Sequence, residues 1–542
     1  MMRPTRRDLI PPEAPLRARA ASCLCLAQAL LCAAVLSFGA GCSEDNPCQV
    51  PSACPVLSCV PSESATPVGD VCGVFVSPSL GVDDALGSKA KPFKSIKAAV
   101  AVVTTKRIYL CAEEIQESVT LRPGFRVYGG LNCGAGWGWA EGSQSVLTAE
   151  AGAIPLTVAG EAMTEPEEED TPSKIPDGGD GTSSEQDPLI LEDLRIVAKD
   201  AVDEGGSSIA IVAYDALIRM TRSRVEAGSG ADGRPGEGVV QPATSGLAGN
   251  AGKAACSADT VLGGDEVANA CVLRMPSVGG TGGLGSTSGG SGATGLPDLG
   301  QSTGLGGKGA DSLRPCAAGQ VGSAGAVGAA GEGALGPGSI GRMASGVRPG
   351  YVGVSGKDGA PGSPGQGGGG GGGSQGGAAA DKCSDMASDG GASGGSGGAG
   401  GCGGLGGKGG GPGGSSFAIL SLNSTLAFDK TTVVVKKGGK GGDGGAGQPG
   451  GSGGTGGVGG EVPAGSTLLP GCAGGNGGPG GVGGRGGGGQ GGHSIGIAFI
   501  GRSPPSKGLS IEVGTPGAGG AGEGQGGSGA PGKSPKTLRF GE

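Results

Sequence analysis

Apolar residues in the first third of the chain recur in short runs that turn residues separate. One run has the helical spacing i, i+3, i+4, i+7, at Ile96, Ala99, Val100 and Val103, and predicts a helix over 93–105. Strand-like runs recur at short spacing around it, at 74–76, 107–111, 118–121, 125–128, 145–148, 156–159, 189–191 and 194–197. Short, regularly spaced strands after one helix favour a stacked all-β fold in which the helix covers the first open end.

Three later segments repeat one apolar pattern. Each begins with a serine before alternating apolar residues, and a second strand starts about fifteen residues later. The serines are Ser208, Ser416 and Ser494. Such a segment cannot bury its own apolar face, whereas stacked neighbours can. We therefore expect the three segments to stack directly and the sequence between them to leave the stack on one side; chance similarity among short β-type runs is the alternative.

The sequence between these segments is rich in glycine. Of the 131 glycines, 18 lie in residues 1–200 and the other 113 in residues 201–542. Residues 438–461 read as eight Gly-rich triplets, and 471–491 continue the pattern after a turn-like stretch. A period of three matches the polyproline II helix, so the two runs could pack as antiparallel helices with the third residue outward. Flexible, low-complexity coil is the alternative.

One region resembles a known family. Asp83-Asp84-Ala85, Lys91 to Ala99, Ile108-Tyr109-Leu110 and Val127 to Gly130 resemble the entry motif of bacterial right-handed parallel β-helix proteins of the pectin-lyase-like class. The resemblance implies an all-β fold, a right-handed parallel β-helix that long Gly-rich insertions interrupt, the insertions being polyproline II-type or disordered. The Gly-rich composition is also similar to PGRS-type surface proteins, whose characteristic N-terminal domain is absent.

These patterns divide the chain into eight parts. The expected parts are a lipoprotein signal peptide at 1–41, a Cys/Pro/Ser-rich linker at 42–70, the N-terminal β-helix part at 71–228 with an acidic loop at 161–188, a Gly-rich insertion at 229–414, one coil at 415–437, a triplet insertion at 438–492, one coil at 493–514, and a Gly-rich tail at 515–542.

The N-terminus has the features of an export signal. Arginines precede an apolar run from residue 20 to 38, and small residues follow before the chain turns polar. Gly39-Ala40-Gly41-Cys42 resembles the lipobox of bacterial lipoproteins, although Gly39 stands where that family usually has Leu. The resemblance implies acylation of Cys42, with palmitate among the attached chains, and Ser43 favours the outer membrane. An uncleaved anchor is the alternative.

The cysteine count fits an oxidising compartment. Once the signal and Cys42 are set aside, twelve of the sixteen cysteines remain, an even number that predicts disulfides. The candidates are Cys48, Cys54, Cys59, Cys72, Cys111, Cys133, Cys256, Cys271, Cys316, Cys383, Cys402 and Cys472. With no C-x2-C pair and one histidine, a zinc site is disfavoured, and we expect no metal or cofactor.

Catalytic chemistry finds little support. The acids of the predicted coils are scattered, and the chain has neither a calcium loop nor a nucleophile motif. His493 is expected in a structural position. A net charge of −9 without a basic stripe argues against nucleic-acid binding. We expect a non-enzymatic lipoprotein of the cell envelope, periplasmic or surface-exposed, with a structural or adhesive role and a polysaccharide or surface-protein ligand. A secreted carbohydrate-active lyase or hydrolase is the alternative; convergence of Asp193, Asp215, Arg195 and Arg219 on one face would favour it.

Overall fold

The computed structural model describes most of the chain beyond the N-terminal region. It covers residues 58–541 except 65, 83, 161–186, 272–275, 299–301, 334–340, 345–349, 384–387 and 525. The predicted signal peptide, Cys42, Cys48, Cys54 and nearly all of the acidic loop lie outside these residues. The described residues belong to one compact unit, Leu57–Glu542. Among them no helix has the length and apolar character that crossing a membrane requires.

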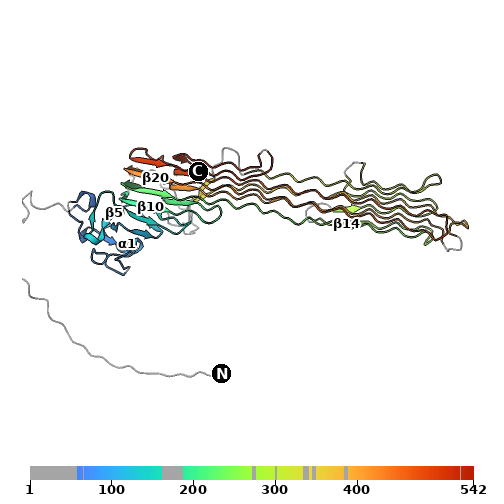
Figure 1. Ribbon diagram of the computed structural model, residues 1–542, viewed down its shortest axis with the longest axis horizontal. Helices are drawn as coiled ribbons and strands as arrows, with labels where there is room; N and C mark the ends of the chain where they lie inside the picture. The colour runs from blue at the N-terminus through green and yellow to red at the C-terminus, as the bar shows by residue number, and fades with distance from the viewer. Residues whose placement is uncertain are drawn as a thin grey trace, which may run out of the picture. The chain divides into compact units, whose positions relative to one another are not determined.

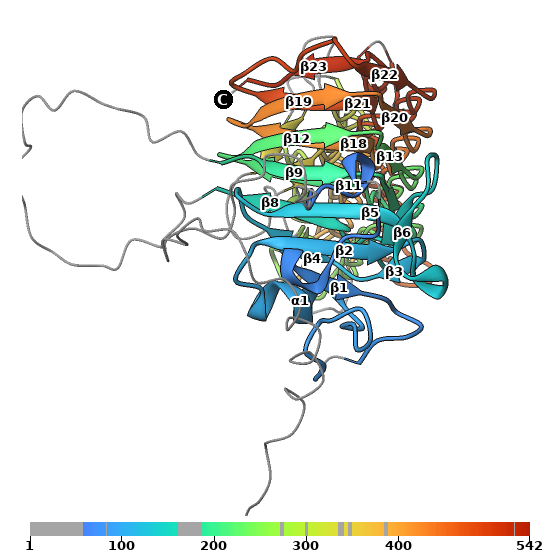
Figure 2. The same cartoon turned by 90° about the vertical axis from the view of Figure 1, so that its left-hand side faces the viewer.

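Three parallel sheets form the body of this unit, with strands from both ends of the described chain (Figures 1 and 2). Sheet 1 contains β1 (Val74–Val76), β2 (Arg107–Cys111), β5 (Arg126–Asn132), β9 (Leu189–Glu192), β12 (Leu217–Thr221) and β19 (Thr425–Asp429), with β6 (Gly138–Trp139) antiparallel to β5. Sheet 2 contains β3 (Glu114–Gln116), β7 (Ser145–Thr148), β10 (Leu194–Ala198), β13 (Arg224–Ala227), β20 (Thr431–Val435) and β22 (Leu509–Glu512). Sheet 3 contains β4 (Val119–Leu121), β8 (Leu156–Ala159), β11 (Ser208–Tyr214), β18 (Ser416–Leu422), β21 (Ser494–Ile500) and β23 (Thr537–Arg539).

The remaining regular elements are short. The α-helix α1 (Ile96–Val102) begins after Ser95, whose side chain accepts a hydrogen bond from the Ala98 amide. It contacts β1, β2 and β4, as expected for a helix over the first strands. The others are the 3-10 turns η1 (Pro61–Glu63), η2 (Asp70–Cys72) and η3 (Cys133–Ala135) and the hairpins β14 (Val267–Asn269) with β15 (Ser277–Gly279) and β16 (Arg342–Ala344) with β17 (Gly350–Val352).

The three repeated segments stack in the register that their alignment predicts. Ser208 pairs with Ser416, and Ser416 pairs with Ser494, in adjacent parallel strands. Each serine hydroxyl accepts a hydrogen bond from the amide twenty residues later, at Gly228, Lys436 and Gly514. The hydroxyl therefore closes one circuit of the sheets at the point where the Gly-rich sequence leaves. The expectation of direct stacking is confirmed.

The predicted single right-handed parallel β-helix is wrong for this chain. The structure shows stacked parallel sheets that do not form one continuous helix. Sheet 1 ends at β19, whereas sheets 2 and 3 continue to β22 and β23, so the last circuit lacks a strand. Between β13 and β18 the chain also leaves the sheets altogether. The entry motif reports the local strand and helix pattern correctly, but it carries no information on how the Gly-rich half folds.

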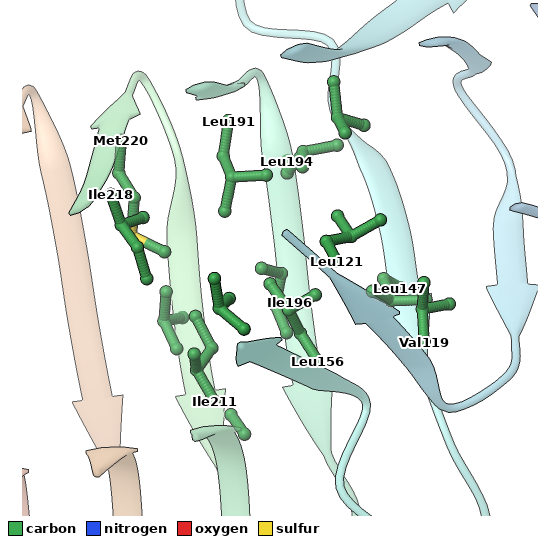
Figure 3. Packing of buried hydrophobic residues seen from close by; sticks show 14 of the residues in the cluster. Val119, Leu121, Leu147, Leu156, Leu191, Leu194, Ile196, Ile211, Ile218 and Met220 are labelled. Atoms are coloured by element: carbon green, nitrogen blue, oxygen red, sulfur yellow. The ribbon is translucent and has the colours of Figure 1, made fainter. Parts of the chain in front are cut away.

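The main core lies between the three sheets. Figure 3 shows aliphatic side chains from all three sheets that meet there, including Leu191, Ile196 and Ile211. Each of these three side chains is at most 1% exposed. At about 25 cal/mol per Å² of buried apolar area, such a column of aliphatic residues supplies the main stabilisation of the body.

Two outer faces of the sheets are also covered. On sheet 1, the rings of Phe75, Tyr109 and Tyr128 stack at centroid distances of 5.0 and 5.5 Å. On sheet 3, Phe417 contacts Tyr351 of β17 and Phe540, at 5.0 and 6.3 Å between ring centroids. These contacts explain why the seven residues of β18 are all buried.

The Gly-rich sequence forms an ordered array beside the sheets (Figure 1). We call these segments the array: 228–255, 319–333, 356–374, 391–414, 438–461, 471–492 and 515–522. They are neither α-helix nor strand, and the hydrogen bonds from one segment to any one neighbouring segment recur at every third residue. Residues 471–492 pair antiparallel with 439–460, from Gly471 N to Gly460 O through to Gly492 N to Gly439 O. The three-residue period matches that of polyproline II helices, and the structure shows paired segments in place of flexible coil.

The number of glycines per triplet follows the number of covered faces. In 367–373 every residue is glycine, and added Cβ atoms would meet backbone oxygens on three sides. The Gly367 position faces Val278 O at 1.9 Å, Gly368 faces Gly475 O at 2.0 Å, and Gly369 faces Leu305 O at 2.0 Å. The edge segment 319–333 has one glycine per triplet along most of its length, and its other positions carry side chains that are largely exposed. Glycine is therefore required wherever another segment packs, because a Cβ atom has no room there.

Candidate functional site: charged clusters and the distal loops

The charged residues that would favour an enzyme do not converge. Arg195 lies on β10 of sheet 2, whereas Arg219 lies exposed on β12 of sheet 1. Asp193 is buried in the turn between β9 and β10, and Asp215 is exposed in the turn between β11 and β12. A glycosidase needs two carboxyl groups facing each other across one site, and these residues do not form one.

One buried ionic cluster lies at the turn between sheets 1 and 2. Arg222 binds both acids: Nε donates to Asp193 Oδ1 at 2.9 Å, and Nη2 donates to Glu192 Oε2 at 2.8 Å and to Asp193 Oδ2 at 2.9 Å. Trp139 Nε1 donates to the second Asp193 oxygen at 2.9 Å. The Asp193 hydrogen bond raises the pKa of Arg222, while burial raises the pKa of Glu192 despite its pairing. With its charges paired, this cluster stabilises the turn, where Asp193 and Arg222 both have positive φ.

A second cluster lies on the outer face of sheet 2. Arg195 Nε donates to Glu226 Oε1 at 2.7 Å, and Arg224 Nε donates to the same oxygen at 2.6 Å. The Arg195 hydrogen bond lowers the pKa of Glu226. This cluster cross-links neighbouring strands. His493 is fully buried against aromatic rings, and its Nδ1 accepts a hydrogen bond from the Lys533 amide at 2.9 Å. Its position is therefore structural.

The expected disulfides are present. Among the described residues five bonds join Cys59–Cys72, Cys111–Cys133, Cys256–Cys383, Cys271–Cys402 and Cys316–Cys472. In the same part of the chain, one group has side chains close enough to hold a metal ion: Cys111, Glu113 and Cys133. Two of its three members are joined in a disulfide, so this group does not offer the thiolates that zinc requires.

The loops at the far end of the array depart from the Gly-rich triplet pattern. We call 311–315, 375–383 and 467–469 the distal loops (Figure 1, the end of the array opposite the sheets). Cys316–Cys472 connects the segments that hold the first and third loops, and Cys256–Cys383 fixes the end of the second. Thr467 N and Oγ1 both donate to the Asp381 carbonyl, at 2.7 and 3.0 Å. The three loops are thus tied to one another and to the array.

A cavity of about 310 Å³ lies between the distal loops. Its lining combines cationic, polar and apolar side chains: Asp311, Ser312, Leu313, Arg314, Gln375, Lys382, Thr467, Leu468 and Leu469. Leu468 is buried and anchors the third loop, whereas Leu313 and Leu469 are 88% and 55% exposed. Two other cavities are lined almost entirely by uncharged residues, one beside Cys271 and Cys402 and one beside α1. Of these three, the distal cavity alone brings two cations together.

Sequence reasoning did not find the distal residues. Arg314 and Lys382 are 68 residues apart in sequence, and no motif links them. One signal was available: the cavity-lining side chains outside the triplet pattern stand close to Cys316, Cys383 and Cys472, which an even cysteine count already marks as disulfide candidates.

Comparison with known proteins adds no relative. No family model matches the chain, and neither the curated proteins nor the solved structures contain a match.

Proposed function

We propose that this chain is a lipid-anchored protein of the bacterial cell envelope with a structural or adhesive role. In this proposal Cys42 carries the lipid, the sheets form the base, and the array holds the distal loops toward a partner. The signal-like sequence before Cys42 supports the anchor. The outer membrane is the proposed location, with the array periplasmic or at the surface.

The observation that carries the adhesive role is the hydrogen-bonded array that ends in tied loops. Each long segment is bonded to two or more neighbours, so a bending motion must break hydrogen bonds on several sides. A binding surface at the end of such a support needs little ordering on association, which raises affinity. Catalysis gains no comparable support, because the charged residues of each cluster on the sheets form ion pairs within that cluster.

Two measurements test this proposal. Intact mass of the protein extracted from membranes with detergent should show a diacyl or triacyl adduct on Cys42, and a Cys42→Ala variant should be released as soluble protein. Cells that carry the full chain should adhere to glass coated with matrix extracted from their own culture, and protease treatment that releases Gly-rich peptides should abolish adhesion. An unmodified soluble chain would refute the anchor; unchanged adhesion after protease treatment would refute the adhesive role.

A further inference from the structure

We propose that the distal cavity binds an acidic polysaccharide through Arg314 and Lys382. This inference rests on the proposed adhesive role and names its ligand class. The volume of the cavity, about 310 Å³, lies at the small end of the range for ligand sites, and polar groups converge there among apolar side chains.

The carboxylates beside the cavity accept hydrogen bonds from the loops and keep their negative charge, whereas neither cation forms an ion pair within the described residues. Asp311 Oδ1 accepts hydrogen bonds from the amides of Leu313 and Arg314, both at 2.8 Å. Asp381 Oδ2 accepts from Thr467 Oγ1 at 2.9 Å. Among the described residues, the side chains of Arg314 and Lys382 have no ion-pair partner. An anionic ligand would therefore meet two cations without first displacing a carboxylate.

The rest of the lining suits a sugar rather than a simple anion. Arg314 can bind a carboxylate through two parallel N–H groups, and the Lys382 ammonium adds a second charge. Ser312, Gln375 and Thr467 bring hydroxyl and amide groups that can hydrogen-bond sugar hydroxyls. Leu313 and Leu469 bring exposed apolar surface for the C–H faces of a sugar ring. A carboxylate-bearing polysaccharide uses all three kinds of contact.

The disulfides prearrange this site. Pro315 and Lys382 each precede a disulfide-bonded cysteine, Cys316 and Cys383. Fixed loops lose little entropy on binding, so modest contacts suffice for each repeating unit. Several copies of the chain on one cell would bind a polymer together, which multiplies the apparent affinity.

The test uses the full chain, with polygalacturonate as the acidic probe and dextran as the neutral probe. The wild-type protein should retain polygalacturonate, lose it with rising salt, and not retain dextran. The double variant Arg314→Gln/Lys382→Gln should bind at least about tenfold more weakly, since two charged hydrogen-bond partners are removed. Lys507→Gln/Lys536→Gln, which removes two exposed charges from the sheet body, is the matched control and should bind as wild type.

The cell-adhesion assay separates this inference from the proposed function. The inference is overturned if the double variant binds polygalacturonate as wild type, or if the wild type does not bind it. If the double variant still adheres to matrix-coated glass whereas Cys316→Ser/Cys472→Ser does not, the adhesive role holds and the acidic ligand is wrong. If neither variant changes adhesion, the distal loops are not the adhesive site and both proposals fail there.

Discussion

Gly370→Ala is expected to disrupt the array although it adds a single methyl group. Gly370 lies in the all-glycine run, where its added Cβ would stand 1.9 Å from Thr281 O and 2.5 Å from Thr281 C. Ordinary contact begins near 3.4 Å, so the neighbouring segment must move by about 1.5 Å. Such a shift breaks the hydrogen bonds that the Thr281 segment makes to the run, Gly280 N to Gly368 O and Gly283 N to Gly371 O, at 2.9 and 2.7 Å.

The expected cost follows from these two bonds. Each lost hydrogen bond costs about 1 kcal/mol, rising to roughly 3 kcal/mol where a buried group is left without a partner, so the two bonds together give about 2–6 kcal/mol. The measurement is the free energy of unfolding in guanidinium, with far-ultraviolet circular dichroism as the signal that monitors unfolding. Ala324→Val is the control, because it adds carbon at an exposed position of an edge segment and should change stability by less than about 0.5 kcal/mol. Equal effects of the two variants would refute the packing argument.

Three further variants test the sheets. Ser494→Ala removes a hydroxyl that donates to Lys436 O at 2.7 Å and accepts from Gly514 N, and should cost about 1–2 kcal/mol of stability. Ser421→Ala should be neutral or stabilising, because Ser421 Oγ is buried without a hydrogen-bond partner in the described part of the chain. Thermal unfolding that ranks the two variants the other way would contradict this. Glu226→Gln should cost about 1 kcal/mol at pH 7, discounted because Arg195 is 44% exposed. The folded pKa of Glu226 is lowered, so its contribution is present above the unfolded pKa and lost as pH falls through the folded pKa; unfolding curves of variant and wild type should converge in acid.

The local elements could be predicted from the sequence because their determinants are local. The spacing from Ile96 to Val103 indicates the helix, and the serines at 208, 416 and 494 mark the start of three of the six strands of sheet 3. The triplet register and the intervening turn also allowed an antiparallel pairing of 438–461 with 471–491, which is the arrangement observed, but the sequence alone left flexible coil as the alternative. In each case the residues that decide the structure lie within one segment or its direct repeat.

The organisation of 229–414 could not be predicted, because its determinants are contacts between distant segments. Residues 230–255 pair with 437–461, about 207 positions later, and the sequence of a Gly-rich triplet does not specify which segment it pairs with. The pairing of Cys256 with Cys383 depends on the same packing, and so does the distal cavity. The prediction of a single β-helix was wrong for a related reason. Strand patterns predict that sheets form, but the route of the chain from one strand to the next depends on how the array packs.

Hydrogen exchange along one array segment tests the central claim that the Gly-rich half is an ordered, hydrogen-bonded support. Within 441–446, the amides of Gly441, Gly442, Gly444 and Gly445 donate to neighbouring segments at 2.8 Å. Exchange of the intact protein, read by mass spectrometry at single-residue resolution, should therefore be slow at these four glycines and fast at the outward residues Asp443 and Ala446. Uniformly fast exchange across the segment would contradict the account, because it would mean that the array does not persist in solution.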